Sequence, residues 1–183
     1  MAKLILGPTG SGKTTYINDL IEKKLIKYED LVFGFEIKKF FFKFWKKKKK
    51  ISKSSIIHYN ILNSFIKLGN GEKNISLKKD KILNNILSYK NILDEIIIIV
   101  APVEELVLRA KTRKKIEENI DTVYDNVFWA KTLKHIDLLN IYEQLFEILD
   151  NLEMKYKVVF SSLNNFKQSN KDKILKNLEG VCD

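Results

Sequence analysis

The sequence predicts an α/β protein in three layers, with a five-stranded, mostly parallel sheet and helices on both faces. Three observations lead to this prediction. Strand-like and helix-like segments alternate along the chain, one apolar run suits a strand buried on both faces, and the length fits one domain. The chain has 183 residues, of which 45% are hydrophobic, so it can bury a sizeable core without disulfides. We therefore expect residues 1–183 to form a single domain.

Five segments have the composition of strands, because they are rich in Val, Ile, Leu and Phe. The clearest is 95–101, where four consecutive isoleucines and a valine predict a strand buried on both faces of a parallel sheet. Pro102 ends this strand. In chain order, the predicted strands are residues 3–6, 31–37, 56–62, 95–101 and 156–160.

Segments with helical spacing of apolar residues separate the strands. Ile17, Leu20 and Ile21 have this spacing in the first of them, and residues 129–152 form the longest amphipathic pattern. A strand, a helix and a second strand make a βαβ unit, in which the two strands are parallel. In chain order, the predicted helices are residues 14–24, 78–88, 103–117, 129–152 and 170–178.

Positive charge is concentrated in one basic and aromatic insert, residues 37–53. The formal net charge is +10, and nine of the 33 Lys and Arg residues lie between Lys38 and Lys53, where there is no acidic residue. The rest of the chain is nearly neutral, which argues against a nucleic-acid binder. On a helical wheel, residues 37–50 place aromatic and aliphatic side chains on one arc. Three hypotheses stay open: an acceptor site for an anionic molecule, a core face with solvated lysines, or docking on an anionic membrane surface.

Composition excludes several other classes of protein. Cys182 is the only cysteine, which excludes an intramolecular disulfide and a multi-cysteine zinc site. The aliphatic run 96–101 is much shorter than the ~20 residues of a membrane span, and the apolar run 4–6 is too short for a signal peptide. The expected location is the cytoplasm, with no membrane span.

One motif predicts a phosphate-binding loop. Residues 7–14 read Gly-Pro-Thr-Gly-Ser-Gly-Lys-Thr and fit the pattern G-x-x-x-x-G-K-[ST] at every position, between a predicted strand and a predicted helix. Gly7, Gly10 and Gly12 are expected to take positive φ angles, which turn backbone N–H groups around a phosphate. The helix N-terminus adds partial positive charge there. The motif predicts a P-loop NTPase fold and a nucleoside triphosphate ligand, and a chance glycine-rich turn is the alternative.

The side chains of this loop have separate predicted roles. Lys13 reaches the β and γ phosphates, the Thr14 hydroxyl is a ligand of Mg²⁺, and Thr15 meets the α phosphate. ATP and Mg²⁺ are therefore the expected cofactors. The residues predicted to bind the nucleotide are Gly7, Pro8, Thr9, Gly10, Ser11, Gly12, Lys13, Thr14 and Thr15.

With this loop near its start, a length near 180 residues and five repeated strand–helix units, the chain resembles small P-loop kinases of the nucleoside-monophosphate, shikimate and adenylylsulfate kinase kind. In such kinases the fourth strand is followed by a helix bearing arginines and then by a lid. The corresponding segment here carries Arg109 and Arg113. The resemblance implies a lid at residues 109–128 and transfer of the γ-phosphoryl group of ATP to a small acceptor. The sequence does not identify the acceptor, and a nucleotide derivative, a sugar and an intermediate of surface-polysaccharide synthesis all stay open.

Arg109 and Arg113 also stand out by composition. They are the only arginines, against 31 lysines, and they lie four residues apart on one helix face. A guanidinium binds phosphate oxygens in a bidentate way that an ammonium does not reproduce. Both arginines are therefore predicted to clamp the transferring phosphoryl group. The alternative is a pair of surface charges, paired with Glu105 or Glu117.

The chain departs from the pattern of these kinases where acidic residues are expected. They carry an Asp after the second strand that orients the acceptor hydroxyl, and the only carboxylate offered here is Glu36, which becomes the candidate catalytic base. At the third strand, His58 and Asn60 stand where an acid is expected. The alternatives are an ordinary strand-end acid for Glu36 and polar residues at the sheet edge for the other two.

Two further functions stay open. The loop spelling also resembles that of tRNA prenyltransferases, which hold a diphosphate, although their Asp-Ser pair and their tRNA-binding insertion are missing. A non-catalytic module that binds a nucleotide or a nucleic acid would explain the basic insert and the missing acid. The expected partners are a nucleoside triphosphate and a small-molecule acceptor. Nucleic acid is not expected, and the residues select neither the acceptor nor an oligomeric state.

Overall fold

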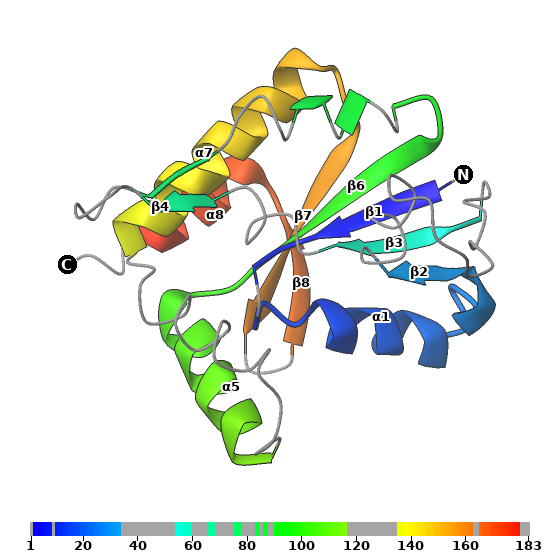
Figure 1. The fold of residues 1–183 in the computed structure, drawn as a ribbon, viewed down its shortest axis with the longest axis horizontal. Coiled ribbons are helices and arrows are strands. Elements are labelled where there is room, and N and C mark those ends of the chain that lie inside the picture. Colours follow the sequence, from blue (N-terminus) through cyan, green and yellow to red (C-terminus); the bar gives the residue numbers. More distant parts are fainter. Residues whose placement is uncertain are drawn as a thin grey trace.

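The computed structural model describes residues 2–8, 10–33, 54–59, 66–68, 75–77, 83–84, 86–87, 90–116, 135–162 and 165–179. Its main feature is a six-stranded mixed sheet in the order β2-β3-β1-β6-β7-β8 (Figure 1). The first five strands in this order are parallel, and β8 runs antiparallel to β7. The strands of this sheet are β1 (Ala2–Leu6), β2 (Leu31–Phe33), β3 (Ile56–Tyr59), β6 (Leu93–Val100), β7 (Tyr156–Ser162) and β8 (Asn165–Ser169).

Helices and a second, smaller sheet complete the described structure. β4 (Ile66–Leu68) and β5 (Ile75–Leu77) form a separate antiparallel pair that the sequence did not predict. A short 3₁₀ helix, η1 (Tyr28–Asp30), precedes β2. The α-helices are α1 (Lys13–Glu22), α5 (Val103–Ile116), α7 (His135–Asn151) and α8 (Lys171–Glu179).

The prediction of five strands in the main sheet is corrected to six. The α/β class is confirmed, but β8 was missed because Phe166 is its only apolar residue. β8 forms as the second arm of a hairpin, in which Asn165 pairs with Ser162 and Ser169 pairs with Val158. Backbone pairing with β7 therefore defines this strand, and its sequence has no apolar pattern that would predict it.

The other predicted elements are present wherever the structure describes them, with ends that differ by one or two residues. β6 begins at Leu93, two residues before its predicted start. Four residues of the predicted helix 78–88 are helical: Leu83, Asn84, Ile86 and Leu87. The rest of that helix, parts 34–37 and 60–62 of two predicted strands, and parts 117 and 129–134 of two predicted helices lie outside the described residues. The basic insert 37–53 also lies outside them.

The main sheet has two apolar faces, because successive side chains of a strand point to opposite sides. Leu4 and Leu6 of β1 belong to a core cluster with Leu145 of α7 and Ile174 of α8. Ile5, between them, belongs to a second cluster with Tyr16 of α1. Helix α1 therefore covers one face, and α7 and α8 cover the other (Figure 1). Helices on both faces agree with the prediction.

Strand β6 explains why its sequence is a continuous apolar run. Residues 96–100 are each at most 1% exposed. Ile96 and Ile98 contribute to the cluster with α7, while Ile97 and Ile99 contribute to the cluster with α1. Burying one such side chain stabilises the fold by about 1.5–3 kcal/mol. The apolar run is continuous because the side chains on both faces of β6 are buried, so apolar and polar residues do not alternate along it.

Candidate functional site

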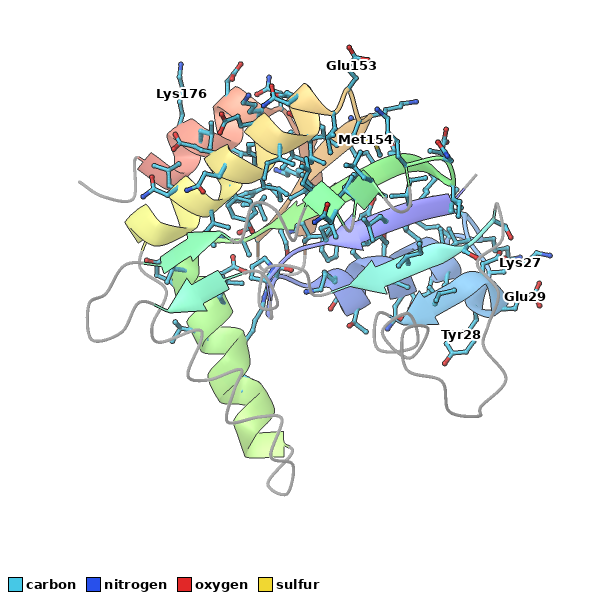
Figure 2. The ribbon with its side chains drawn as sticks, turned by 45° about the horizontal axis from the view of Figure 1, so that its top comes forward. Lys27, Tyr28, Glu29, Glu153, Met154 and Lys176 are labelled. Atoms are coloured by element: carbon cyan, nitrogen blue, oxygen red, sulfur yellow. The ribbon has the colours of Figure 1, made fainter. Side chains whose placement is uncertain are left out.

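The carboxyl ends of the parallel strands share one edge of the sheet, and the site lies there. Leu6 pairs with Tyr59 of β3 and with Ile98 of β6. The opposite edge carries the turns before β2 and β7, where Tyr28 and Met154 lie (Figure 2). Helix α5 extends away from the sheet beyond the carboxyl end of β6 (Figure 1).

The chain reverses its direction of crossing between β1 and β6. From β1 the chain continues through α1 to β2, toward one end of the strand order. From β6 it continues through α5 and α7 to β7, toward the other end of the strand order. In open α/β sheets, ligands bind beyond the carboxyl ends of the strands at such a reversal. The loop that joins β1 to α1 starts at this point.

Glycines shape this loop in two different ways. Gly10 and Gly12 have φ angles of +84° and +91°, a region that L-residues with side chains rarely adopt. Gly7 lacks a positive φ, contrary to our expectation for it. A Cβ atom on Gly7 would lie 2.7 Å from the carbonyl oxygen of Ile99, so glycine is needed there because the loop lies directly against β6.

The side chain of Lys13 folds back into the loop. It is only 6% exposed, and its Nζ donates to the carbonyl oxygens of Gly7 at 2.8 Å and of Pro8 at 2.7 Å. The backbone N–H of Ser11 donates to the same Pro8 oxygen at 3.2 Å. An ammonium group and a backbone N–H therefore converge on one point inside the turn, which is an arrangement that can bind an anion.

A buried hydroxyl adds to the polar groups of the loop. Ser11 is fully buried, and within the described residues its Oγ has no hydrogen-bond partner. A buried polar group without a partner costs about 1–3 kcal/mol, and this Oγ lies close to Gly7, where an added Cβ would be 2.6 Å from it. Thr14 and Thr15 follow on the first turn of α1, and both are exposed.

Arg109 of α5 reaches this loop. Its Nη1 donates to the carbonyl oxygen of Gly10 at 3.0 Å and to Oγ of Ser161 at 3.1 Å. Its Nη2 donates to the carboxylate of Glu105, one turn earlier on the same helix. This is the ion pair that we predicted as the alternative to a clamp on the phosphoryl group.

The remaining predicted site residues lie as follows. Arg113 belongs to α5, one helical turn beyond Arg109. His58 belongs to β3, where it pairs with Ile5 of β1 and Phe33 of β2. Thr9, Glu36 and Asn60 lie outside the described residues. The structure thus brings Lys13 and Arg109 together at one loop.

Sequence reasoning missed Ser161 and Phe166 beside the loop. A Cβ on Gly12 would lie 3.0 Å from Oγ of Ser161 and 3.3 Å from the ring of Phe166. Ser161 is fully buried near the carboxyl end of β7. A serine directly after a predicted apolar strand was the signal available for Ser161, and Phe166 had none because β8 was not predicted.

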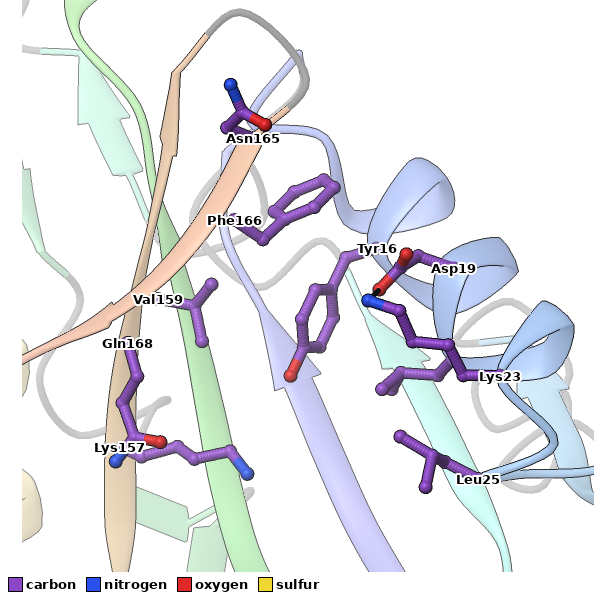
Figure 3. Close-up of a pocket in the computed structure, with 10 residues that line it drawn as sticks. Tyr16, Asp19, Lys23, Leu25, Lys157, Val159, Asn165, Phe166 and Gln168 are labelled. Carbon is purple, nitrogen blue, oxygen red and sulfur yellow. Dashed lines mark hydrogen bonds and ion pairs between the residues drawn. The ribbon is translucent and has the colours of Figure 1, made fainter.

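A groove runs along α1 beside the hairpin of β7 and β8 (Figure 3). It has a volume of about 350 Å³. Tyr16 and Phe166 pack edge to face at its loop end, with ring centroids 5.2 Å apart. Burial raises the pKa of Tyr16, and the charges of Glu95 and Asp19 raise it further, so the phenol stays neutral at physiological pH. The two rings stand between the loop and the groove.

Comparison with known proteins yields no family. No protein-family model and no curated protein matches the chain. In the part of the chain that the structure describes, no three His, Cys, Asp or Glu side chains come together as a metal site. None of the helices in the described ranges has both the length and the apolar character of a membrane span.

Proposed function

We propose that this protein is a P-loop kinase, which transfers the γ-phosphoryl group of ATP to a small, anionic acceptor and requires Mg²⁺. The observation that carries the proposal is the buried Lys13, whose Nζ lies inside a glycine-shaped turn at the reversal point of a parallel sheet. A fit to the motif and the placement of the loop at that point are independent arguments for phosphate binding.

The loop residues fit the triphosphate of a nucleotide. Lys13 Nζ and the N–H of Ser11 now share the Pro8 oxygen, and phosphate oxygens accept strongly from both kinds of donor. The positive end of the α1 dipole favours the same charge. The proposal assigns Lys13 to the β and γ phosphates, where it stabilises the charge that develops during transfer.

The exposed hydroxyl of Thr14, on the first turn of α1, fits the role of the protein ligand to Mg²⁺. In such sites Mg²⁺ is held mainly by phosphate oxygens and water, with one or two protein ligands. When bound, the ion neutralises charge on the transferring group. Thr14 would hold the ion through its hydroxyl oxygen.

In the proposed reaction, the acceptor hydroxyl oxygen forms a bond to the γ phosphorus while the bond from that phosphorus to the β–γ bridging oxygen breaks. ADP leaves, and the hydroxyl proton passes to a base, for which Glu36 is our candidate. Arg113 is our candidate for binding the transferring group. The nine lysines of residues 38–53 favour an acceptor that already carries negative charge.

The test is binding and turnover of Mg·ATP by the wild-type protein and by Lys13→Ala. Lys13 Nζ donates to the Gly7 and Pro8 carbonyl oxygens within the loop, so we expect the variant to fold and to lose turnover by 100-fold or more, on the order of a transition-state contact. Turnover is measured as labelled phosphate transferred to a panel of sugars and nucleotides. Ser162→Ala, a small change on β7, is the control.

The outcomes separate the proposed kinase from the alternatives. Tight Mg·ATP binding without transfer to any acceptor would favour a non-catalytic nucleotide-binding module. Binding of nucleic acid that weakens steeply with salt would favour a nucleic-acid module. Equal turnover by a folded Lys13→Ala protein would overturn the assignment of the loop.

A further inference from the structure

We propose that Glu105, Arg109 and Ser161 hold residues 7–8 and 10–13 of the loop in their anion-binding shape, and that Arg109 is a positioning residue rather than a phosphate ligand. We call these three residues the loop brace. The inference rests on the proposed nucleotide-binding function. It goes beyond that function because it assigns residues of two distant segments to the shape of the loop.

The brace joins three separate parts of the chain. Arg109 Nη1 lies 3.0 Å from the Gly10 carbonyl oxygen in the loop and 3.1 Å from Ser161 Oγ on β7. The Glu105 carboxylate accepts from Nη2 of the same guanidinium. The side chains of Arg109 and Glu105 are 20% and 14% exposed, and Ser161 is fully buried. Water therefore competes weakly for these hydrogen bonds.

Helix α5 also packs directly on the loop. A Cβ on Gly10 would lie 3.2 Å from the carbonyl oxygen of Leu106, and Leu106 is 1% exposed in the core. The helix that carries Glu105 and Arg109 is therefore anchored beside the loop by its own apolar residue. The guanidinium is held at a fixed position relative to Gly10.

The hydrogen bond to Gly10 fixes the peptide that joins Gly10 to Ser11. In a trans peptide the C=O and the N–H point in opposite directions, and the described residues contain no cis peptide. Holding the Gly10 oxygen toward Arg109 thus turns the Ser11 N–H the other way, toward Pro8 and the Lys13 ammonium. That N–H is one of the two donors that converge inside the turn.

The ion pair distinguishes a positioning role from a direct contact with phosphate. Glu105 neutralises Arg109 and occupies one of its terminal nitrogens. If Arg109 bound phosphate directly, removing the carboxylate would release the guanidinium and strengthen binding of the anion. If Arg109 positions the loop, removing the carboxylate loosens the guanidinium and weakens binding. Glu105→Gln therefore has opposite expected effects under the two roles.

The experiment measures the dissociation constants of Mg·ATP and of pyrophosphate for the full chain by calorimetry. We expect Glu105→Gln, Ser161→Ala and Arg109→Lys each to raise both constants about tenfold, the scale of one hydrogen bond to a charged group. The matched controls are Ser162→Ala, whose side chain points to the other face of β7, and Glu143→Gln, which removes an exposed carboxylate of α7. Both controls should bind like the wild type. Thermal unfolding identifies any variant that does not fold.

Amide hydrogen exchange of residues 7–13 without ligand provides a second measurement. The brace predicts faster exchange at the Ser11 amide in Ser161→Ala and Arg109→Lys than in either control. Tighter binding by Glu105→Gln, or wild-type binding and exchange in Ser161→Ala, would overturn the proposal. If the wild-type protein bound neither ligand, the proposed function would fail, and the exchange measurement would still decide whether the brace shapes the loop.

Discussion

Two ion pairs with the same spacing lie on α1 and on α5, in different surroundings. On α1, Lys23 Nζ lies 2.8 Å from the Asp19 carboxylate, and the two side chains are 61% and 33% exposed. On α5, the side chains of Arg109 and Glu105 are 20% and 14% exposed, and the guanidinium also contacts the loop and β7. Each pair stabilises its own helix slightly. Only the second is part of a tertiary network.

Local spacing therefore does not fix how much an ion pair contributes to stability. An exposed pair exchanges hydration for a weak attraction and contributes about 0–1 kcal/mol. When one residue of a mostly buried pair is removed, the other charge has no partner and little water around it, which strongly destabilises the fold. The tertiary neighbours of Arg109 therefore decide its importance, and four substitutions test this comparison.

The largest effect is expected for Arg109→Met. The Glu105 carboxylate, the Gly10 carbonyl and the Ser161 hydroxyl each lose a donor, so we expect the free energy of unfolding to fall by about 2–3 kcal/mol. Urea unfolding at neutral pH measures this. A loss no greater than that of an exposed pair would remove the distinction between the two helices.

The next effect is expected for Gly12→Ala, which disturbs the loop from the other side. Gly12 has a φ of +91°, and a Cβ there would lie 3.3 Å from Nη1 of Arg109. A left-handed backbone costs an L-residue about 1–2 kcal/mol, and we expect a loss of that size in unfolding experiments. Binding of Mg·ATP should weaken in the same variant, since the added methyl group displaces the guanidinium. Unchanged stability would show that the loop relaxes freely.

A third ion pair, between Asp150 and Lys171, connects two helices, but both of its side chains are exposed. It joins α7 to α8 at 2.9 Å, and the Tyr156 hydroxyl also donates to Asp150. The hydrogen bond from Lys171 lowers the pKa of Asp150 below its ordinary value, burial opposes this, and the bond from Tyr156 assists it. A carboxyl whose pKa is lower in the folded state stabilises the fold above its unfolded pKa. That contribution is lost as the pH falls through the folded pKa.

We therefore expect wild type to be more stable than Asp150→Asn at pH 6, and the difference to vanish on acidification below about pH 4. Thermal unfolding of both proteins between pH 6 and pH 2 measures the difference. The effect should be smaller than that of Gly12→Ala because both charged side chains are well exposed. A difference that persists at pH 2 would mean that Asp150 acts through packing.

The smallest effect is expected for Asp19→Asn. Its pair with Lys23 is local and exposed, so the free energy of unfolding should change by less than about 0.5 kcal/mol. Added salt should reduce even that change. Urea unfolding at low and high salt measures it, and a loss near that of Arg109→Met would contradict the comparison.

Much of the architecture could be predicted because it depends on local patterns. The apolar run at 96–100 predicted the central strand, and the helical spacing of apolar residues predicted α1 and α7. Strand β8 could not be predicted, since Phe166 alone gives no period and the strand exists through its hairpin with β7. The pair β4–β5 was missed in the same way, because three-residue strands are too short for a pattern.

The candidate site also has one part that depends on local sequence and another that depends on contacts between distant segments. The loop could be predicted from sequence alone, since its glycines and Lys13 act within a few residues of one another. Glycine is favoured at the strongly positive φ angles of Gly10 and Gly12 and at the close backbone approach of Gly7. The sequence also placed Glu105 and Arg109 one helical turn apart. The contacts of Arg109 with Gly10 and Ser161, which lie 99 and 52 residues away along the chain, could not be predicted in this way. The physical reason is that hydrogen bonds across such separations depend on how the strands are ordered in the sheet, and no short segment contains that order.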